Sequence, residues 1–192
     1  IELLDGFQNL LPAGTPRHTQ TTASNLVDAY KWSELAQNAN LGMYSLFSAI
    51  TDRAEPCESL KANTVFCLGL DQTTTLLSSQ QIGAFKRGEN LKQEQIIKGI
   101  RGAYLINCQF SLAPQQTKPW HLVSNIEQSQ SQIVSLLNEL NDKDKLLNTI
   151  ESSIHKGSQN LAQKMAAADG FQSTNEELVS AHHYANVLFN VL

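Results

Sequence analysis

Two clusters of polar residues in this sequence carry side chains that could bind a substrate. The first is residues 52–56 (DRAEP), in which Arg53 lies between two carboxylates, those of Asp52 and Glu55. Carboxylates that flank an arginine can bind sugar hydroxyls, and they also form structural ion pairs at the end of a strand. Arg53 and Glu55 are therefore substrate-binding candidates, with a structural corner as the alternative.

The second cluster is on the last expected helix, where His182 and His183 precede Asn186 and Asn190. Adjacent histidines point about 100° apart on a helix, whereas zinc needs ligands on one face. We therefore predict no metal site. His183, Asn186 and Asn190 are three and four residues apart, and they form a polar seam. Because buried polar groups need partners, the seam is predicted to form structural hydrogen bonds or to contribute to a substrate site.

Three aromatic residues, Tyr30, Trp32 and Trp120, lie in or next to expected strands. They could stack on sugar rings if they lined one exposed face. Aromatic side chains also dominate the buried area of sheets, so packing in the core is the competing interpretation.

The sequence has no glycine-rich phosphate loop, no nucleophile elbow and no HExxH motif. We therefore predict no catalytic residue and no cofactor within this chain.

Composition excludes further classes of function. The net charge is −4 and 17% of the residues are charged, which gives no basic surface for nucleic acid. Three cysteines, Cys57, Cys67 and Cys108, lack CxxC spacing and are predicted to be free thiols, which favours a reducing, cytoplasmic location. No apolar run is long enough to span a membrane.

The pattern of apolar residues predicts strands first and helices afterwards. A short helix is expected over residues 1–11 and a polar loop over 15–22. Expected strands cover 25–35, 43–51, 62–70, 100–112 and 120–126, the first two forming a hairpin, with a helix over 76–87. From residue 129 the period changes to about 3.6, with a weak point at Gly157. Strands followed by helices indicate an α+β fold with an antiparallel sheet.

We divide the chain into a mainly antiparallel β region (1–126), a helical linker (127–170) and the start of a further helix (171–192). Thr174 and Glu177 form a capping-box pattern that marks the beginning of this last helix. The helix remains apolar to Leu192 without a stop signal, so the chain is expected to be a segment of a longer protein.

Several phrases resemble one family and keep its order along the chain. They are residues 3–12 (LLDGFQNLLP), 24–31 (SNLVDAYK), 52–56 (DRAEP), 168–172 (ADGFQ) and 181–190 (AHHYANVLFN). The chain is similar to the amino-terminal region of cellobiose-phosphorylase-type inverting glycoside phosphorylases (glycoside hydrolase family 94, formerly glycosyltransferase family 36). Within that family it is nearest to the β-1,2-oligoglucan phosphorylases.

The resemblance implies a β-sandwich, linker helices and a catalytic (α/α)6 barrel, of which this chain would hold only the opening helix. It implies a parent enzyme, commonly a homodimer, that cleaves β-glucosidic bonds with inorganic phosphate and releases a sugar 1-phosphate. Its partners would be a β-glucan oligosaccharide or disaccharide and the barrel, without nucleic acid or membrane. The general acid would lie in the barrel, so this segment alone is expected to be inactive.

Two other classes of function remain as alternatives. A self-standing carbohydrate-binding β-sandwich would expose Tyr30, Trp32 and Trp120 on one face. A helical interaction scaffold would associate through an apolar stripe in residues 129–168.

Overall fold

The computed structural model describes residues 1–36, 38–48, 60–167 and 175–191. Contacts divide the chain into two compact units, Ile1–Asn141 and Asp142–Leu192. The helical linker expected over 127–170 therefore overlaps both units. No helix in these described ranges is both long and apolar enough to cross a membrane.

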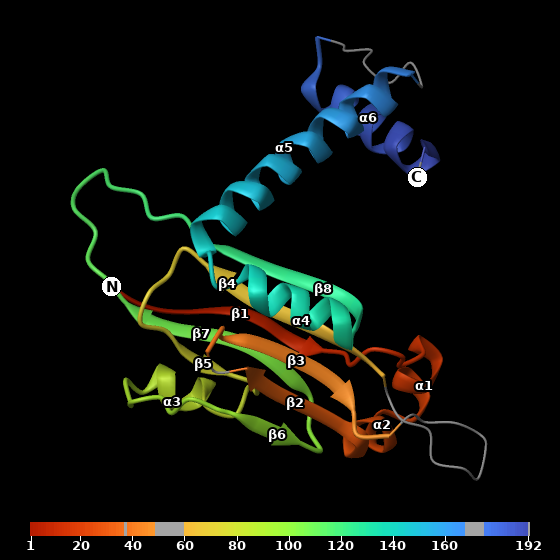
Figure 1. The fold of residues 1–192 in the computed structure, drawn as a ribbon. Coiled ribbons are helices and arrows are strands. Elements are labelled where there is room, and N and C mark those ends of the chain that lie inside the picture. Colours follow the sequence, from red (N-terminus) through yellow and green to blue (C-terminus); the bar gives the residue numbers. More distant parts are fainter. Residues whose placement is uncertain (37, 49–59, 168–174, 192) are drawn as a thin grey trace. The chain divides into compact units, whose positions relative to one another are not determined.

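The first unit contains two antiparallel sheets (Figure 1). The three-stranded sheet has the order β1-β7-β5, and the five-stranded sheet has the order β6-β2-β3-β4-β8. Their strands are β1 (Glu2–Leu10), β2 (Lys31–Ala36), β3 (Leu41–Leu46), β4 (Lys61–Leu68), β5 (Thr74–Leu76), β6 (Ile96–Lys98), β7 (Gly102–Gln109) and β8 (His121–Ser129). Short helices α1 (Arg17–Thr22), α2 (Ser24–Tyr30) and α3 (Ile82–Lys86) connect some of them, and α4 (Gln130–Glu139) follows β8.

The two sheets pack face to face around one apolar core. Inward-facing residues of β2, β3 and β4 meet those of β7, as the alternating pattern of a half-buried strand requires. The core comprises Leu35, Tyr44, Val65, Leu70, Leu77, Tyr104, Ile106 and Cys108. The fold is therefore α+β with antiparallel sheets, as the sequence predicted.

A hydrogen bond between side chains connects the two sheets. The indole Nε1 of Trp120, just before β8, donates to Oδ2 of Asp5 on β1 over 2.7 Å. The other carboxylate oxygen of Asp5 accepts from the backbone N–H of Gly6 at 2.8 Å. Gly6 has φ of +149°, and a Cβ at this position would lie 1.9 Å from the carbonyl oxygen of Tyr104. Gly6 thus allows β1 to approach β7 closely, and the Asp5 side chain accepts the hydrogen bond of the Gly6 N–H at this point.

Two tyrosines fill the space between the sheets where glycines leave room. The Tyr44 hydroxyl donates to the carbonyl of Ala103 over 2.7 Å, and Tyr104 donates to the carbonyl of Asn40 over 2.7 Å. A Cβ at Gly42 or Gly102 would come within 2.8 Å of these rings. Burial raises the pKa of Tyr44 well above its ordinary value, and the neighbouring Tyr104 and Glu94 raise it further.

Helix α4 packs on the outer face of the five-stranded sheet, next to β8 (Figure 1). Ser129 caps its first turn, because its hydroxyl accepts from the Gln132 N–H while the Gln132 side chain accepts from the Ser129 N–H. Leu136 and Leu140, four residues apart, are buried. The helix is therefore fixed at both ends, and its exposed side remains free to form a surface.

The second unit contains α5 (Lys143–Ala167) and α6 (Glu177–Val191). The two helices contact each other, and Leu146 and Ser180 are their most buried described residues. Thr174, which was expected to cap the last helix, lies outside the described residues.

Several expected elements are wrong in detail. Within residues 1–11, expected as a helix, Glu2–Leu10 form a strand, since pairing with β7 overrides the helix-like spacing, and positive φ at Gly6 and Asn9 excludes a regular helix. Residues 24–30 form a helix in which Val27 is buried, although a strand was expected over 25–35. Residues 17–22 form α1 in the expected loop, and the helix expected over 76–87 shortens to Ile82–Lys86. Gly157 does not interrupt α5, because a single glycine costs a long helix only about 1 kcal/mol.

Candidate functional site

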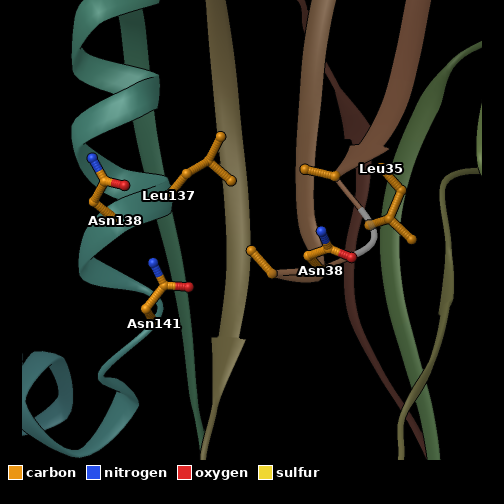
Figure 2. A pocket seen from close by; sticks show the side chains of 7 residues that line it. Leu35, Asn38, Leu137, Asn138 and Asn141 are labelled. Carbon is orange, nitrogen blue, oxygen red and sulfur yellow. The ribbon is translucent and has the colours of Figure 1, made fainter.

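A groove of about 550 Å³ opens on the first unit between the β2–β3 turn and the end of α4. Figure 2 shows Asn38 on the turn side, and Leu137, Asn138 and Asn141 on the helix side. We call it the amide groove. Its lining consists of three asparagines and four apolar residues: Asn38, Asn138, Asn141, Leu35, Ala36, Ala39 and Leu137.

Local structure explains how each wall is built. On the turn side, Ala39 N–H donates to the Ala36 carbonyl over 3.1 Å, and Asn40 adopts φ of +49°, which asparagine tolerates better than most residues. The Tyr104 hydroxyl holds the carbonyl of Asn40. On the helix side, Asn138 lies in the last turn of α4, and Asn141 follows the helix, where its N–H donates to the Asn138 carbonyl over 3.3 Å. Both walls are thus anchored to the core of the sandwich.

The chemistry of the amide groove is polar and neutral. None of its seven lining residues is titratable. The side-chain amides of Asn38, Asn138 and Asn141 are exposed and form no hydrogen bond with other described residues. An amide offers two donors and one acceptor oxygen, so the groove can both donate to and accept from a ligand, and Ala36, Ala39 and Leu137 provide apolar surface.

The predicted aromatic residues do not share one face. Trp32 is half-buried on the outer face of the five-stranded sheet, where its ring stacks on Phe47 with centroids 5.9 Å apart. The Lys98 ammonium lies 3.8 Å from the Trp32 ring centroid, a cation–π contact. Trp120 instead packs against the core between the sheets and donates to Asp5. The stacking surface that would need Tyr30, Trp32 and Trp120 together is therefore not formed.

The predicted polar seam lies on α6 in the second unit. His183 is half-buried and its Nε2 has no hydrogen-bond partner among the described residues, while Asn186 and Asn190 are exposed. The Asn190 amide donates to the Asn186 carbonyl over 3.0 Å, as i−4 bonds within a helix do. The structure thus brings Asn186 and Asn190 together and leaves one polar atom of His183 unpaired.

The other predicted site residues, Arg53 and Glu55, lie outside the described residues, as does Cys57. Of the remaining cysteines, Cys67 is half-buried and Cys108 is buried, and both are free thiols. Burial raises the pKa of the Cys108 thiol. In the described ranges, no three histidine, cysteine, aspartate or glutamate side chains gather as a metal site would require.

A buried lysine of the first unit has a structural explanation. Lys31 is almost fully buried, and its ammonium contacts the Asp28 carboxylate at 2.7 Å. The guanidinium of Arg101 approaches the other oxygen of Asp28 at 3.6 Å. This ion-pair cluster compensates the burial of Lys31 and joins α2 to the sandwich.

Sequence reasoning missed the amide groove. Asn38 lies about a hundred residues from Asn138, and each taken alone is an ordinary turn or helix-end asparagine. Two separate signals were available in the sequence. Asn138 and Asn141 are three residues apart near the end of an expected helix, and residues 38–40 have a composition typical of a turn. Nothing in the spacing indicated that the two segments meet.

Comparison with models of protein families gave no match for this chain, and a search of curated proteins found no significant relative.

Proposed function

We propose that this chain is a non-catalytic segment of an inverting glycoside phosphorylase, a carbohydrate-active enzyme that acts on β-linked glucan. The observation that supports the proposal best is the order of its parts. An antiparallel two-sheet sandwich comes first, and α4 then leads to a separate unit of two helices. This is the order that the resemblance of residues 3–12, 24–31 and 181–190 implies.

The position of the first family-like phrase adds support. Asp5 and Gly6 lie in residues 3–12 and occupy the closest approach of β1 to β7, where Asp5 also holds Trp120. Residues of this phrase therefore stabilise the packing of a β-sandwich, and a β-sandwich is the fold that the resemblance implies for this region.

In the proposed parent enzyme, inorganic phosphate attacks the anomeric carbon and one carboxylic acid protonates the departing glycosidic oxygen. Phosphate takes the position that water has in inverting hydrolases, so one carboxyl group is sufficient, and the configuration at the anomeric carbon inverts. We assign this acid to the barrel of the parent and no catalytic step to the present chain. The proposal includes a homodimeric parent in the cytoplasm.

The test uses the full parent protein with phosphate and β-linked glucose disaccharides and oligosaccharides. We expect release of glucose 1-phosphate that depends on added phosphate. Absence of this product with every linkage would contradict the proposal. The 192-residue chain assayed alone should give no product, and turnover by it would refute its non-catalytic assignment.

A carbohydrate-binding sandwich is the second candidate, and a different observation favours it. The aromatic platform that it was expected to need is not formed, but the neutral amide groove has the donors, acceptors and apolar surface that sugars use. Binding of glucan by a protein that shows no phosphorolysis would favour this second candidate.

A further inference from the structure

We propose that the outer face of the five-stranded sheet, beside α4, binds an amphipathic helix of a partner protein that runs antiparallel to α4. The surface consists of outward side chains of β2, β3 and β6 and of the residue that follows β3. We call it the outer strip, and its residues are Trp32, Glu34, Met43, Phe47, Ile96 and Lys98. The inference does not depend on the proposed function, because it uses only contacts within the first unit.

The outer strip is largely apolar and accessible. Buried and half-buried residues alternate along β2, so Trp32 and Glu34 point outward. Phe47 and Ile96 beside them are 73% and 49% exposed. Helix α4 contacts β8, at the opposite edge of the same sheet from β6 (Figure 1). Contiguous apolar surface of this kind marks an interaction site in soluble domains.

Two hollows follow the side of α4 that adjoins the strip. The first turn of α4 lines a hollow of about 140 Å³ with Gln130 and Ile133, and Trp32 and Glu34 line the same hollow. The end of α4 lines the amide groove together with Ala36. The hollows thus accompany β2 along α4, whose ten residues span about 15 Å. About three turns of a second helix would occupy that length.

The strip suits a helix better than an extended segment. Strands β2 and β3 are paired on both sides, so the strip offers no free backbone edge to which a strand could add. Recognition must therefore use side chains, as when the apolar face of an amphipathic helix enters a groove. Ile133 and Leu137 of α4 are half-buried and four residues apart, which provides a ridge for such a helix to pack against.

Two charged residues determine which helix fits. In the sheet register, Glu34 lies between Met43 and Ile96, and its half-buried carboxylate has no hydrogen bond or ion pair with the other described residues. Covering this carboxylate requires a compensating cation, so the helix must present a lysine or arginine to it. The Lys98 ammonium lies over the Trp32 ring without an ion-pair partner among the described residues. It favours the carbonyl groups and acidic side chains of a helix C-terminus.

The spacing of these charges gives the direction and a sequence pattern. Lys98 pairs with Trp32 in the register, and Glu34 is two residues further along β2, about 7 Å away. Four or five helical residues span that distance at about 1.5 Å each. We therefore expect a basic residue four or five positions before an acidic residue in the last turn. That last turn lies beside the start of α4, so the two helices are antiparallel.

The experiment uses two fluorescent, stapled, alanine-based peptides of about 15 residues with leucines along one face. The staple is required because so short a helix is marginal in water. In the first peptide, a lysine precedes a glutamate of the last turn by four residues, and in the second the two are exchanged. Each is titrated with the 192-residue chain and followed by anisotropy. We expect the first to bind more tightly by on the order of tenfold, about threefold for each ion pair.

Charge reversal on the chain tests where the peptide binds. Glu34→Lys and Lys98→Glu should each abolish the preference, and the double variant should prefer the second peptide. Lys98 is exposed, so its substitution remains informative if Glu34→Lys does not fold, which circular dichroism reports. Glu139→Lys is the matched control, because Glu139 is exposed on α4 and lines neither hollow. It should leave the preference unchanged.

Three results with the peptides would overturn the proposal: no saturable binding up to about 1 mM, binding without a charge preference, or an equal effect of Glu139→Lys. Sedimentation of the chain alone tests a different occupant. Self-association that Phe47→Ser abolishes would assign the strip to a second copy of this chain, and the proposed partner helix would then be rejected.

Discussion

The hydrogen bond from Trp120 to Asp5 gives the most direct test of how the sandwich is held together. It joins the three-stranded sheet to a residue that precedes β8 of the five-stranded sheet. A bond to a charged acceptor contributes about 1.5–3 kcal/mol when well buried. Because both side chains are only half-buried, water replaces part of that energy, and we expect a coupling of about 1–2 kcal/mol.

The coupling is measured with a double-mutant cycle of Asp5→Ala and Trp120→Phe. Asp5→Ala alone also removes the acceptor of the Gly6 N–H, and Trp120→Phe alone also loses packing against the core. These separate costs cancel in the cycle, so the double variant should be more stable than additivity predicts by the coupling energy.

Denaturant unfolding followed by tryptophan fluorescence is the assay. The chain has two tryptophans, Trp32 and Trp120, and both lie in the first unit. Trp32 remains as the reporter when Trp120 is replaced, so the signal follows the sandwich. Asp71→Ala, at an exposed aspartate, is the charge-matched control and should change stability by less than about 0.5 kcal/mol. Additive effects of the two substitutions, within about 0.5 kcal/mol, would refute the reasoning.

Three further predictions follow from backbone fit and from buried hydroxyls. Gly6→Ala should destabilise the first unit by more than the roughly 1–3 kcal/mol of ordinary overpacking, because its Cβ would lie 1.9 Å from the Tyr104 carbonyl oxygen; an unfolding midpoint near that of the unchanged chain would contradict this. Gly157→Ala should increase the helical circular dichroism and stabilise α5 by about 0.5–1 kcal/mol, since nothing lies near the added methyl group, and unchanged helicity would count against it. Burial raises the folded-state pKa of Tyr44 and of Tyr104 above the unfolded value of about 10, so their stabilising contribution is complete below about pH 10 and is lost as pH rises toward the folded-state values. Tyr44→Phe should therefore reduce the loss of stability measured by alkaline unfolding, and an equal loss in both proteins would show that Tyr44 does not contribute.

The fold class could be predicted from the sequence because periodicity carries most of the information. Strands of alternating pattern at 62–70 and 100–112 were placed near β4 and β7, and the change to helical period at residue 129 coincides with the start of α4. The change is also marked locally, since Ser129 and Gln132 form a capping box.

The error over residues 1–11 has a clear physical cause, because a tertiary contact overrides the local preference. Residues 1–11 have apolar spacing suited to a helix, but β7 offers a complete row of backbone partners. Residues 25–30 were included in the strand expected over 25–35 because that whole stretch holds aromatic and aliphatic residues, yet they form α2, in which Val27 is buried. The pairing of β1 with β7 cannot be read from a window of sequence, whereas Asp28 and Lys31, three residues apart and paired at 2.7 Å, were a local signal for a helix.

The candidate site illustrates the same limit at the level of function. The polar seam of His183, Asn186 and Asn190 was predictable because its residues share one helix. The amide groove was not, because a turn and a helix end about a hundred residues apart must first be brought together by packing on the sandwich. Sequence patterns report chemistry that one element holds, whereas binding surfaces often combine elements. In this chain, the two segments that line the amide groove come together only in the folded first unit.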